Sequence, residues 1–288
     1  MFDLTIRRTM EPKVQGPIVM ITGCRSGIGK SLASAFAFRG AHVLATARQA
    51  SQLQDLCAEH ANITALSLDL DRPEDINHLH TAVQELTGGK IDFLINNAGL
   101  HYSALAMDLD MEEVHKVFSV NVFSVMRLCS AFLPMLRRGE HRNRAIVQIG
   151  SVTRDIPVVW QSAYNASKAA LSQYTKTLRL EVKPLNISVV EVVTGFVQSD
   201  ILRHGFYPPS NSLYIPVQEQ MEKIKLHGNA SGMAAGKYAG SIAEKLLATK
   251  RFPTSEVWQG TLAWKLRLAV AICPLWLLAE LRCGHATL

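Results

Sequence analysis

The fold of this chain is decided by the stretch PIVMITGCRSGIGKSLASAFAFR, residues 17–39. Its first five residues, Pro17 to Ile21, form a short apolar run that is typical of a buried strand. A glycine-rich turn, TGCRSGIG at 22–29, follows directly, and Lys30 to Arg39 then have the periodicity of a helix. A strand, a glycine-rich turn and a helix in this order can bring backbone N–H groups close to a bound diphosphate.

The glycines of this turn have distinct expected roles. Gly23 permits a tight turn, Gly27 lets the backbone approach a pyrophosphate, and Gly29 allows the helix and the strand to pack closely. The spacing is G-x-x-x-G-x-G rather than G-x-G-x-x-G, and a glycine turn without a ligand is the alternative. The candidate cofactor-binding residues in this turn are Gly23, Arg25, Ser26, Gly27, Ile28 and Gly29.

Strand and helix patterns alternate along the rest of the chain. Further strands are predicted at 41–45, 63–68, 91–95, 145–149, 186–193 and 255–259, and further helices at 73–86, 111–136, 161–182 and 232–249. This alternation indicates βαβ units. We therefore predict a Rossmann-type, doubly wound α/β fold with a parallel seven-stranded sheet and helices on both faces. One domain is expected over 17–260, after an irregular lead-in at 1–16 and before a hydrophobic tail at 261–288.

Residues that follow the predicted strands are candidates for cofactor binding. The second strand ends in Thr46-Ala47-Arg48, without the carboxylate that commonly accepts from the ribose 2′-OH of NAD. Arg48, helped by Arg25, could instead pair with the 2′-phosphate of NADP, although a solvent-facing Arg48 is the alternative. Asp69 could accept a hydrogen bond from an adenine amino group. The small and amide residues Asn97, Ala98 and Gly99 could line the cofactor.

The stretch SVTRDIPVVWQSAYNASK, residues 151–168, carries the candidate chemistry. Tyr164 and Lys168 are four residues apart on a predicted helix, so their side chains project from the same face. An ammonium group near a phenol favours the phenolate, so Lys168 is expected to lower the tyrosine pKa. The Ser151 hydroxyl could hydrogen-bond the oxygen whose charge changes. The alternative is an exposed Tyr and Lys on an ordinary helix.

These residues together resemble a known family, the short-chain dehydrogenase/reductases. The matching motifs are TGCRSGIG at 22–29, Asp69, NNAG at 96–99, Asn121, Ser151 and YNASK at 164–168. Each motif is weak alone, but their order and spacing are highly specific. The resemblance covers residues 17–200 in motif and continues to about 259 in length and pattern.

The resemblance implies roles for individual residues. Ser151, Tyr164 and Lys168 would form the catalytic core, with Tyr164 as the general acid in reduction and Ser151 orienting and polarising the carbonyl. Lys168 would lower the tyrosine pKa and hold the nicotinamide ribose, while Asn121 would position a water that relays protons. From the residues alone, Asn121 is either a satisfied structural amide or part of a polar relay. The hydride would come from the cofactor, NADP(H).

One segment departs from the family pattern. Many members follow the sixth strand with Pro-Gly, whereas this chain has Val193-Thr194-Gly195. That loop usually contacts the nicotinamide, and Thr194 and Val197 are the candidates here. The chain resembles the 1-acyldihydroxyacetone-phosphate reductase subgroup in its TGCRSGIG turn, in ATAR at 45–48 and in VVTG at 192–195. This resemblance implies dependence on NADPH, a lipophilic ketone as substrate and membrane association. Similar chains reduce polyketide- or terpenoid-like ketones, others resemble hydroxysteroid or retinol dehydrogenases, and a non-catalytic NADPH-binding regulator is the alternative outside enzymes.

Two segments lie beyond the repeating α/β pattern. Residues 194–228 have little regular pattern and several aromatic side chains, which predicts an apolar lid over the substrate or, alternatively, a surface excursion. In the tail at 261–288, the longest uncharged run, Leu268 to Ala279, is too short and too interrupted by Pro274 to span a bilayer. The tail's tryptophans and basic residues, such as Trp264 and Lys265, suit a helix or loop lying in lipid headgroups of the endoplasmic reticulum or a lipid droplet. Packing on the domain or on a second subunit is the alternative.

Composition excludes several other classes. The chain is 48% hydrophobic and 19% charged, with a net charge of +6, and its densest basic stretch, 137–144, lacks interleaved aromatics, so no nucleic-acid binding is expected. Five cysteines without a C-x-x-C pair suggest reduced thiols on the cytoplasmic side. His78 and His80 lack further ligands, so no metal site is expected. No secretory signal is recognised at the N-terminus. The helices with Asn121 and Tyr164 are common dimer faces in the family, so a homodimer is an open expectation.

Overall fold

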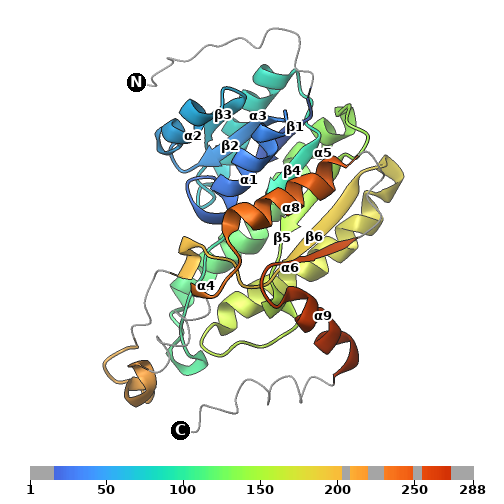
Figure 1. Ribbon diagram of the computed structural model, residues 1–288. Helices are drawn as coiled ribbons and strands as arrows, with labels where there is room; N and C mark the ends of the chain where they lie inside the picture. The colour runs from blue at the N-terminus through green and yellow to red at the C-terminus, as the bar shows by residue number, and fades with distance from the viewer. Residues whose placement is uncertain (1–15, 203–207, 220–229, 249–254, 274–288) are drawn as a thin grey trace.

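The structure of the protein, a computed structural model, describes residues 16–202, 208–219, 230–248 and 255–273. All but the last residue of the expected lead-in and the part of the tail after residue 273 lie outside the described residues. The central element is one parallel sheet in the order β3-β2-β1-β4-β5-β6-β7 (Figure 1). Its strands are β1 (Ile18–Ile21), β2 (His42–Ala47), β3 (Ile63–Ser67), β4 (Phe93–Asn96), β5 (Ala145–Ile149), β6 (Ser188–Thr194) and β7 (Glu256–Gln259). The predicted seven-stranded, parallel, doubly wound sheet is confirmed.

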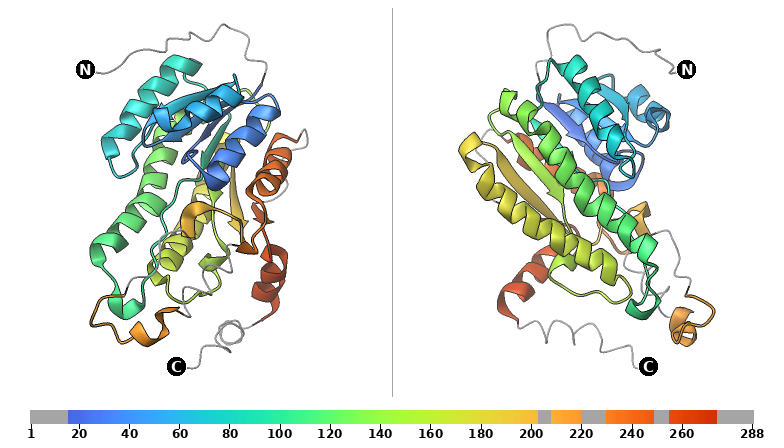
Figure 2. Two further views of the ribbon diagram at one scale, coloured as in Figure 1. Left: turned by 60° about the vertical axis from the view of Figure 1, so that its left-hand side comes forward. Right: turned by 180° about the vertical axis from the view of Figure 1, so that it is seen from behind.

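Helices cover both faces of this sheet (Figure 2). They are α1 (Gly27–Phe38), α2 (Gln54–Glu59), α3 (Pro73–Thr87), α4 (Met111–Phe118), α5 (Ser124–Arg138), α6 (Ser162–Glu181), α8 (Ala235–Leu247) and α9 (Ala263–Ile272). Side chains of α1, α2 and α8 pack into the core on one face, and those of α3, α5 and α6 pack into the core on the other. Strands covered on both sides consist of nearly continuous apolar runs, which is why β1, β4 and β5 were recognisable.

Element boundaries differ from the predictions where local signals are weak. The helix expected at 30–39 begins at Gly27, inside the glycine-rich turn. The helix expected at 111–136 contains a wider, π-helical turn at Ser119–Phe123, between α4 and α5. The six residues of α2 are too few to show a helical period, so this helix was not predicted.

The continuous helical run Met111–Arg138 is long and apolar enough, by length and composition, to cross a membrane, and it is the one such helix within the described ranges. Half of its most apolar window is buried in the domain. A core helix passes the same test, so this run is weak evidence for a membrane span. Its packing against α3 and α6 on the sheet accounts for its apolar character.

The strand order places one edge of the sheet at the centre of the site. The chain crosses from β1 to β2 and β3 on one side and to β4, β5 and β6 on the other, so the order reverses between β1 and β4. In such sheets, ligands bind outside the carboxyl ends of the strands at this reversal. Thr22, Asn97, Gly150 and Gly195, which follow β1, β4, β5 and β6, therefore lie along one edge.

Candidate active site

The glycine-rich turn has the shape that a diphosphate needs. Gly23 and Gly27 have positive φ angles of 74° and 57°, which residues with a side chain rarely adopt. A Cβ on Gly29 would lie 2.0 Å from the carbonyl oxygen of Gly23 and 2.5 Å from Nδ2 of Asn97. The close approach between this turn and the first turn of α1 therefore depends on glycine.

The N-terminus of α1 is open to an anion. Its N-cap residue, Ser26, makes no side-chain capping bond, and its first turn contains no acidic residue. Unpaired N–H groups and the helix dipole attract negative charge at such an end, and Arg25 and Arg48 add positive charge to the same pocket. The residues present thus fit the diphosphate of a dinucleotide cofactor.

Asn97 holds the ends of two neighbouring strands together. Its Nδ2 donates to the backbone oxygens of Thr22, at 2.8 Å, and Gly23, at 3.2 Å. The backbone N–H groups of Asn97 and Ala98 both donate to Oγ1 of Thr22, each at 3.0 Å. These bonds fix the turn after β1 against the turn after β4, so the glycine turn is pre-organised.

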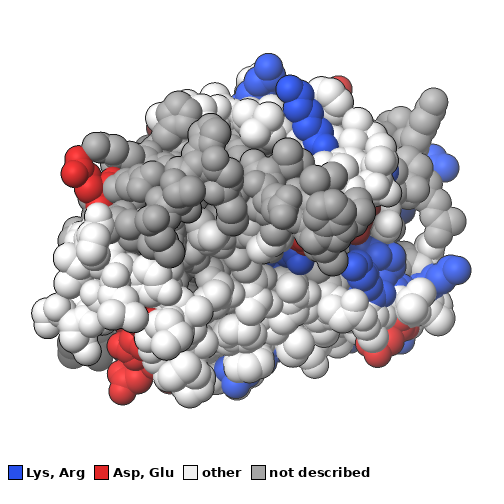
Figure 3. Space-filling view, turned by 90° about the horizontal axis from the view of Figure 1, so that it is seen from below, with Lys and Arg blue, Asp and Glu red and all other residues white. Residues whose placement is uncertain are grey.

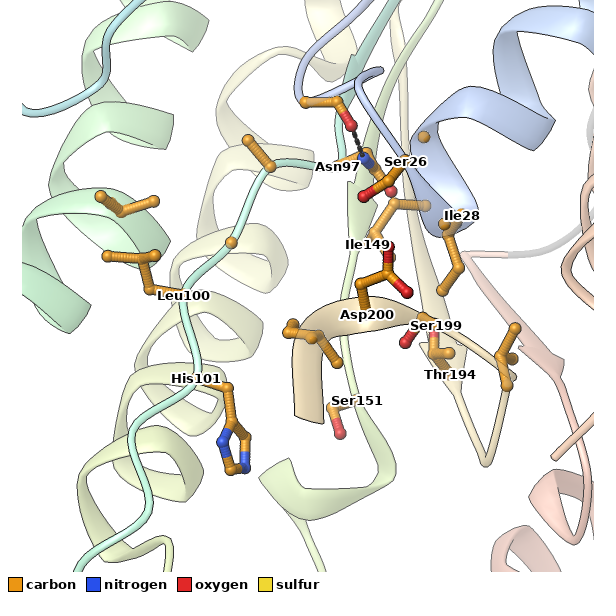
Figure 4. Close-up of a pocket in the computed structure, with 18 of the residues that line it drawn as sticks. Ser26, Ile28, Asn97, Leu100, His101, Ile149, Ser151, Thr194, Ser199 and Asp200 are labelled. Atoms are coloured by element: carbon orange, nitrogen blue, oxygen red, sulfur yellow. Dashed lines mark hydrogen bonds between the residues drawn. The ribbon is translucent and has the colours of Figure 1, made fainter. Parts of the chain in front are cut away.

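A pocket of about 730 Å³ runs from the glycine turn to the end of β5. Figure 4 shows Ser26 and Asn97 at one end of it and His101 and Ser151 at the other. Of the predicted site residues, those lining the pocket are Gly23, Arg25, Ser26, Gly27, Ile28, Gly29, Arg48, Asp69, Asn97, Ala98, Gly99, Ser151, Tyr164, Lys168, Thr194 and Val197. The structure therefore gathers into one cavity residues that are widely separated along the chain.

Asn121 is the predicted residue that does not line the pocket. It is buried in the π-helical turn, where its Oδ1 accepts from the N–H of Leu100 at 2.8 Å. Its Nδ2 donates to the backbone oxygen of Leu100 at 2.9 Å and to Oγ of Ser167 at 3.0 Å. The side chain thus ties the loop after β4 to α6, and a Cβ on Gly99 would approach its Oδ1 to 3.3 Å. Its role in a water relay stays a prediction.

Ser151 lies directly after β5, where it caps a 3-10 turn at Val152–Arg154. Its Oγ accepts from the backbone N–H of Thr153 at 3.2 Å and from Oγ1 of Thr153 at 3.0 Å. Because both acceptor positions of the hydroxyl are then used, its own proton is left to donate. Thr153 therefore orients the Ser151 hydroxyl as a donor.

Tyr164 and Lys168 lie on one face of α6, with Nζ of Lys168 5.7 Å from the centre of the tyrosine ring. Nζ also donates to the backbone oxygen of Ile149 at 2.9 Å, which joins α6 to the end of β5. Burial lowers the pKa of Lys168 to about 8, and the charge of Glu191 opposes that change. The ring of His101 stands 4.8 Å from that of Tyr164, centre to centre.

The expected direction of the Tyr164 pKa is wrong for this structure. Burial raises the pKa of Tyr164 to about 12, and a hydrogen bond with Ser151 lowers it only in part. Loss of contact with water disfavours the phenolate, and Nζ of Lys168 bonds to a backbone oxygen rather than to the phenol. The Tyr164 residue still keeps some exposure toward the pocket, so water moderates this rise. Tyr164 is accordingly a protonated, donating group at neutral pH.

Comparison with known proteins identifies the family. The family model described as short chain dehydrogenase matches residues 17–206. The chain belongs to the short-chain dehydrogenase family. It is 34% identical over 257 residues to a short-chain dehydrogenase of Aspergillus ruber, covering 88% of this chain and 87% of the relative.

Two further comparisons refine the family assignment of this dehydrogenase. It is 39% identical over 208 residues to the NADPH-dependent 1-acyldihydroxyacetone phosphate reductase of Schizosaccharomyces pombe, covering 70% of this chain and 69% of that one. A solved short-chain dehydrogenase from Streptomyces avermitilis superposes with a TM-score of 0.77 at 26% identity and covers 96% of this chain and 100% of its own. The dehydrogenase is thus an oxidoreductase of a family that binds a nicotinamide cofactor.

The loop after β6 takes part in the pocket of the dehydrogenase through more residues than predicted. Oγ1 of Thr194 and the hydroxyl of the buried Tyr238 hydrogen-bond at 2.8 Å, so α8 anchors the end of β6. Val197 pairs with Met233 in a short bridge and lines the pocket, as expected. Ser199 and Asp200 also line it, and both lie near Gly27.

Sequence reasoning missed these two residues and also His101 and Gln161. Figure 4 shows Asp200 between the two ends of the pocket. His101 hydrogen-bonds Oε1 of Gln161, which links the loop after β4 to the start of α6 beside Tyr164. Ser199 lies five residues after Thr194, and His101 lies two residues after the NNAG motif. Their closeness in sequence to predicted site residues was the signal that could have identified them. Within the described part of the chain, no group of three His, Cys, Asp or Glu side chains could hold a metal ion.

Proposed function

We propose that the protein is an NADP(H)-dependent carbonyl reductase that acts on a lipophilic ketone, or on the corresponding secondary alcohol in reverse. The observation that carries this proposal is the convergence of Ser151, Tyr164 and Lys168 in the pocket that begins at the glycine turn. A bound nicotinamide cofactor would supply or accept the hydride. The protein's own part is to bind, to orient and to move one proton.

The proton chemistry follows from the geometry of the site. Tyr164, which is protonated at neutral pH both at its ordinary pKa and at the pKa raised by burial, would donate its proton to the carbonyl oxygen during reduction. The Ser151 hydroxyl, already accepting from Thr153, would donate a hydrogen bond to the same oxygen. Lys168 in its ammonium form would stabilise the phenolate left after proton transfer. Oxidation of an alcohol needs that phenolate, so its rate should rise with pH.

The choice of NADP over NAD rests on the end of β2. Arg48 lines the pocket where β2 ends, and the positions before it, Thr46 and Ala47, provide no carboxylate for a ribose 2′-OH. A guanidinium there suits a 2′-phosphate. Arg25 reaches the same pocket from the glycine turn. The printed name of the Schizosaccharomyces pombe relative supports this choice, since that enzyme is NADPH-dependent.

The lipophilic substrate is inferred from the pocket walls beyond the cofactor region. The apolar residues that line the pocket include Leu100, Val152, Val158, Phe196 and Ile201. Residues 194–197 and 199–201 are the part of the expected lid at 194–228 that lines this pocket. For a 1-acyldihydroxyacetone phosphate, basic residues near the lid would be needed, and Arg203, His204 and Lys223 lie outside the described residues. A hydroxysteroid or a retinol would need no such charge.

A peripheral contact with a membrane on the cytoplasmic side is a further part of the proposal. On the face seen from below in Figure 3, uncharged residues make up most of the described surface, and groups of Lys and Arg lie among them. At that end lies α9, where Trp264, Leu268 and Ile272 follow each other at intervals of four residues and are exposed. Such a stripe suits the boundary between headgroups and acyl chains.

The expected homodimer stays a prediction that light scattering would test.

The test of catalysis is a spectrophotometric assay of NADPH consumption with a panel of lipophilic ketones. The wild type should turn over at least one of them, and Tyr164→Phe should reduce kcat by about 10²–10⁴-fold, the range for loss of a general acid. An NADPH-binding regulator would instead bind the cofactor without consuming it. Equal turnover by the two proteins would remove Tyr164 from the mechanism.

A further inference from the structure

A buried carboxylate lies beneath the proposed active site. Glu191, in the middle of β6, is 0% exposed, and its register partner on β7 is a second glutamate, Glu256. Partners in a parallel pair project from the same face of the sheet, so two like charges lie side by side. Such an arrangement is unfavourable without a cation between them.

Arg154 provides that cation. Its side chain is 5% exposed and donates through Nη1 to Oε2 of Glu191 and through Nη2 to Oε1 of Glu256, the latter at 2.9 Å. Nε bonds to Asp155 at 2.8 Å, and the guanidinium lies 5.4 Å from the ring centre of Trp258. Arg154 ends the 3-10 turn that begins after Ser151. The ion pairs of Arg154 with Glu191 and Glu256 therefore connect β6 and β7 to the turn that carries the Ser151 hydroxyl.

The same carboxylate also contacts the helix of Tyr164 and Lys168. Oγ of Ser172, one turn after Lys168 on α6, donates to Oε2 of Glu191 at 3.0 Å. The other oxygen, Oε1, has no hydrogen-bond partner among the described residues, and a Cβ on Gly150 would lie 2.4 Å from it. Gly150 directly follows Ile149, whose backbone oxygen accepts from Lys168. The carboxylate thus lies against Gly150, between the backbone oxygen that Lys168 contacts and the residue Ser151.

We propose that Glu191 is a positioning residue of the Ser151–Tyr164–Lys168 site, in which its buried carboxylate, held by Arg154 and Ser172, is the internal counter-ion of Lys168. This inference rests on the proposed function, because it assigns Glu191 a part in the same proton chemistry. Burial disfavours the ammonium form of Lys168 and lowers its pKa, and the charge of Glu191 opposes that effect. The counter-ion keeps Lys168 charged at neutral pH.

Several titratable or charged groups surround Lys168 and Glu191. Tyr164 lies on the same helix as Lys168, Tyr238 approaches from α8, and His101 lies against Tyr164 from the loop after β4. Arg154 and Arg179 act on Glu191 from the turn after β5 and from the end of α6. The charge of Glu191 raises the pKa of Lys168 against the effect of burial.

The test compares Glu191→Gln with a matched control, Glu256→Gln. Glutamine keeps an oxygen that can accept from Ser172 and Arg154 and removes the charge. Glu256 binds the same guanidinium, but its side chain is 27% exposed, so water and salt screen its charge more than that of Glu191. In the pH profile of kcat/KM for ketone reduction, Glu191→Gln should move the alkaline limb to lower pH by at least about half a unit, because Lys168 would lose its proton earlier. Glu256→Gln should leave the limb unmoved.

A second measurement separates this inference from the proposed function. The folded-state pKa of Lys168 is depressed, so the unfolded chain binds the proton more strongly and stability rises with pH above about 8. In thermal unfolding scans, that rise should begin at lower pH in Glu191→Gln and at the wild-type pH in Glu256→Gln. If the wild type shows no Tyr164-dependent turnover, the proposed function fails, and the unfolding scans alone then test whether Glu191 is the counter-ion of Lys168. Profiles and scans of Glu191→Gln that superimpose on those of the wild type would overturn the counter-ion role.

Discussion

Replacing Arg154 with methionine is expected to destabilise the folded protein by about 3–5 kcal/mol at pH 7, the range for removing one partner of a buried ion pair. Methionine fills much of the space of the arginine stem but carries no charge. The change leaves Glu191, which is fully buried, and its register partner Glu256 as two uncompensated carboxylates. The protein loses bonds to three acidic side chains, which include Asp155.

This loss of free energy of unfolding corresponds to a large decrease of the unfolding temperature. For domains of 150–250 residues, 1 kcal/mol corresponds to roughly 2–4 °C, so a fall of about 10 °C is expected. The three bonds share one guanidinium, and their contributions are therefore not additive. Most of the loss comes from the buried charge of Glu191 rather than from the partly exposed Glu256 and Asp155.

The loss of stability in Arg154→Met should be smaller at lower pH. Burial already raises the pKa of Glu191 even with Arg154 present, and removal of the guanidinium raises it further. A carboxyl group with a raised pKa in the folded state destabilises the fold when it is ionised, and protonation relieves this cost. The difference between variant and wild type should therefore shrink as the pH falls from 7 toward 5.

Differential scanning calorimetry and urea unfolding at pH 5 and pH 7 measure both the loss of stability and its dependence on pH. The exposed Arg127→Met is the control, with an expected change within about 0.5 kcal/mol. Arg154→Met combined with Glu191→Gln should recover part of the stability at pH 7. A loss below about 1 kcal/mol, or the same loss at both pH values, would refute the assignment of Arg154 as the counter-charge of a buried carboxylate pair.

Three other variants test separate parts of the molecule. Gly29→Ala puts a Cβ 2.0 Å from the carbonyl oxygen of Gly23, so we expect about 1–3 kcal/mol lower stability in urea unfolding and weaker NADPH binding in a fluorescence titration. Arg48→Asp should raise KM for NADPH at least about tenfold relative to KM for NADH, and an unchanged cofactor preference would contradict the argument from the end of β2. The triple variant Trp264→Lys, Leu268→Lys and Ile272→Lys should bind vesicles at least about tenfold more weakly, because each substitution removes apolar surface that the membrane would bury. Undiminished sedimentation of this variant with vesicles would exclude α9 as the contact.

Most of the fold was predictable because its signals are local. The apolar run of β1, the glycines after it and the period of α1 lie within one stretch, and the same alternation recurs up to β7. The spacing of Tyr164 and Lys168 also required only the geometry of a helix. The short α2 and the start of α1 at Gly27 were missed, since six residues show no period and glycine is a poor predictor of a helical turn.

The amino-acid sequence by itself determined the strand–turn–helix order, the absence of a carboxylate after β2, and the residue types available for proton transfer. Only the tertiary structure decided how those residues behave. It placed Asn121 behind the pocket wall, raised the pKa of Tyr164 instead of lowering it, and brought Arg154 to Glu191 and Glu256, which are 37 and 102 residues away along the chain. Local patterns depend on neighbours in sequence, whereas desolvation and charge pairing depend on neighbours in space, which packing alone brings together.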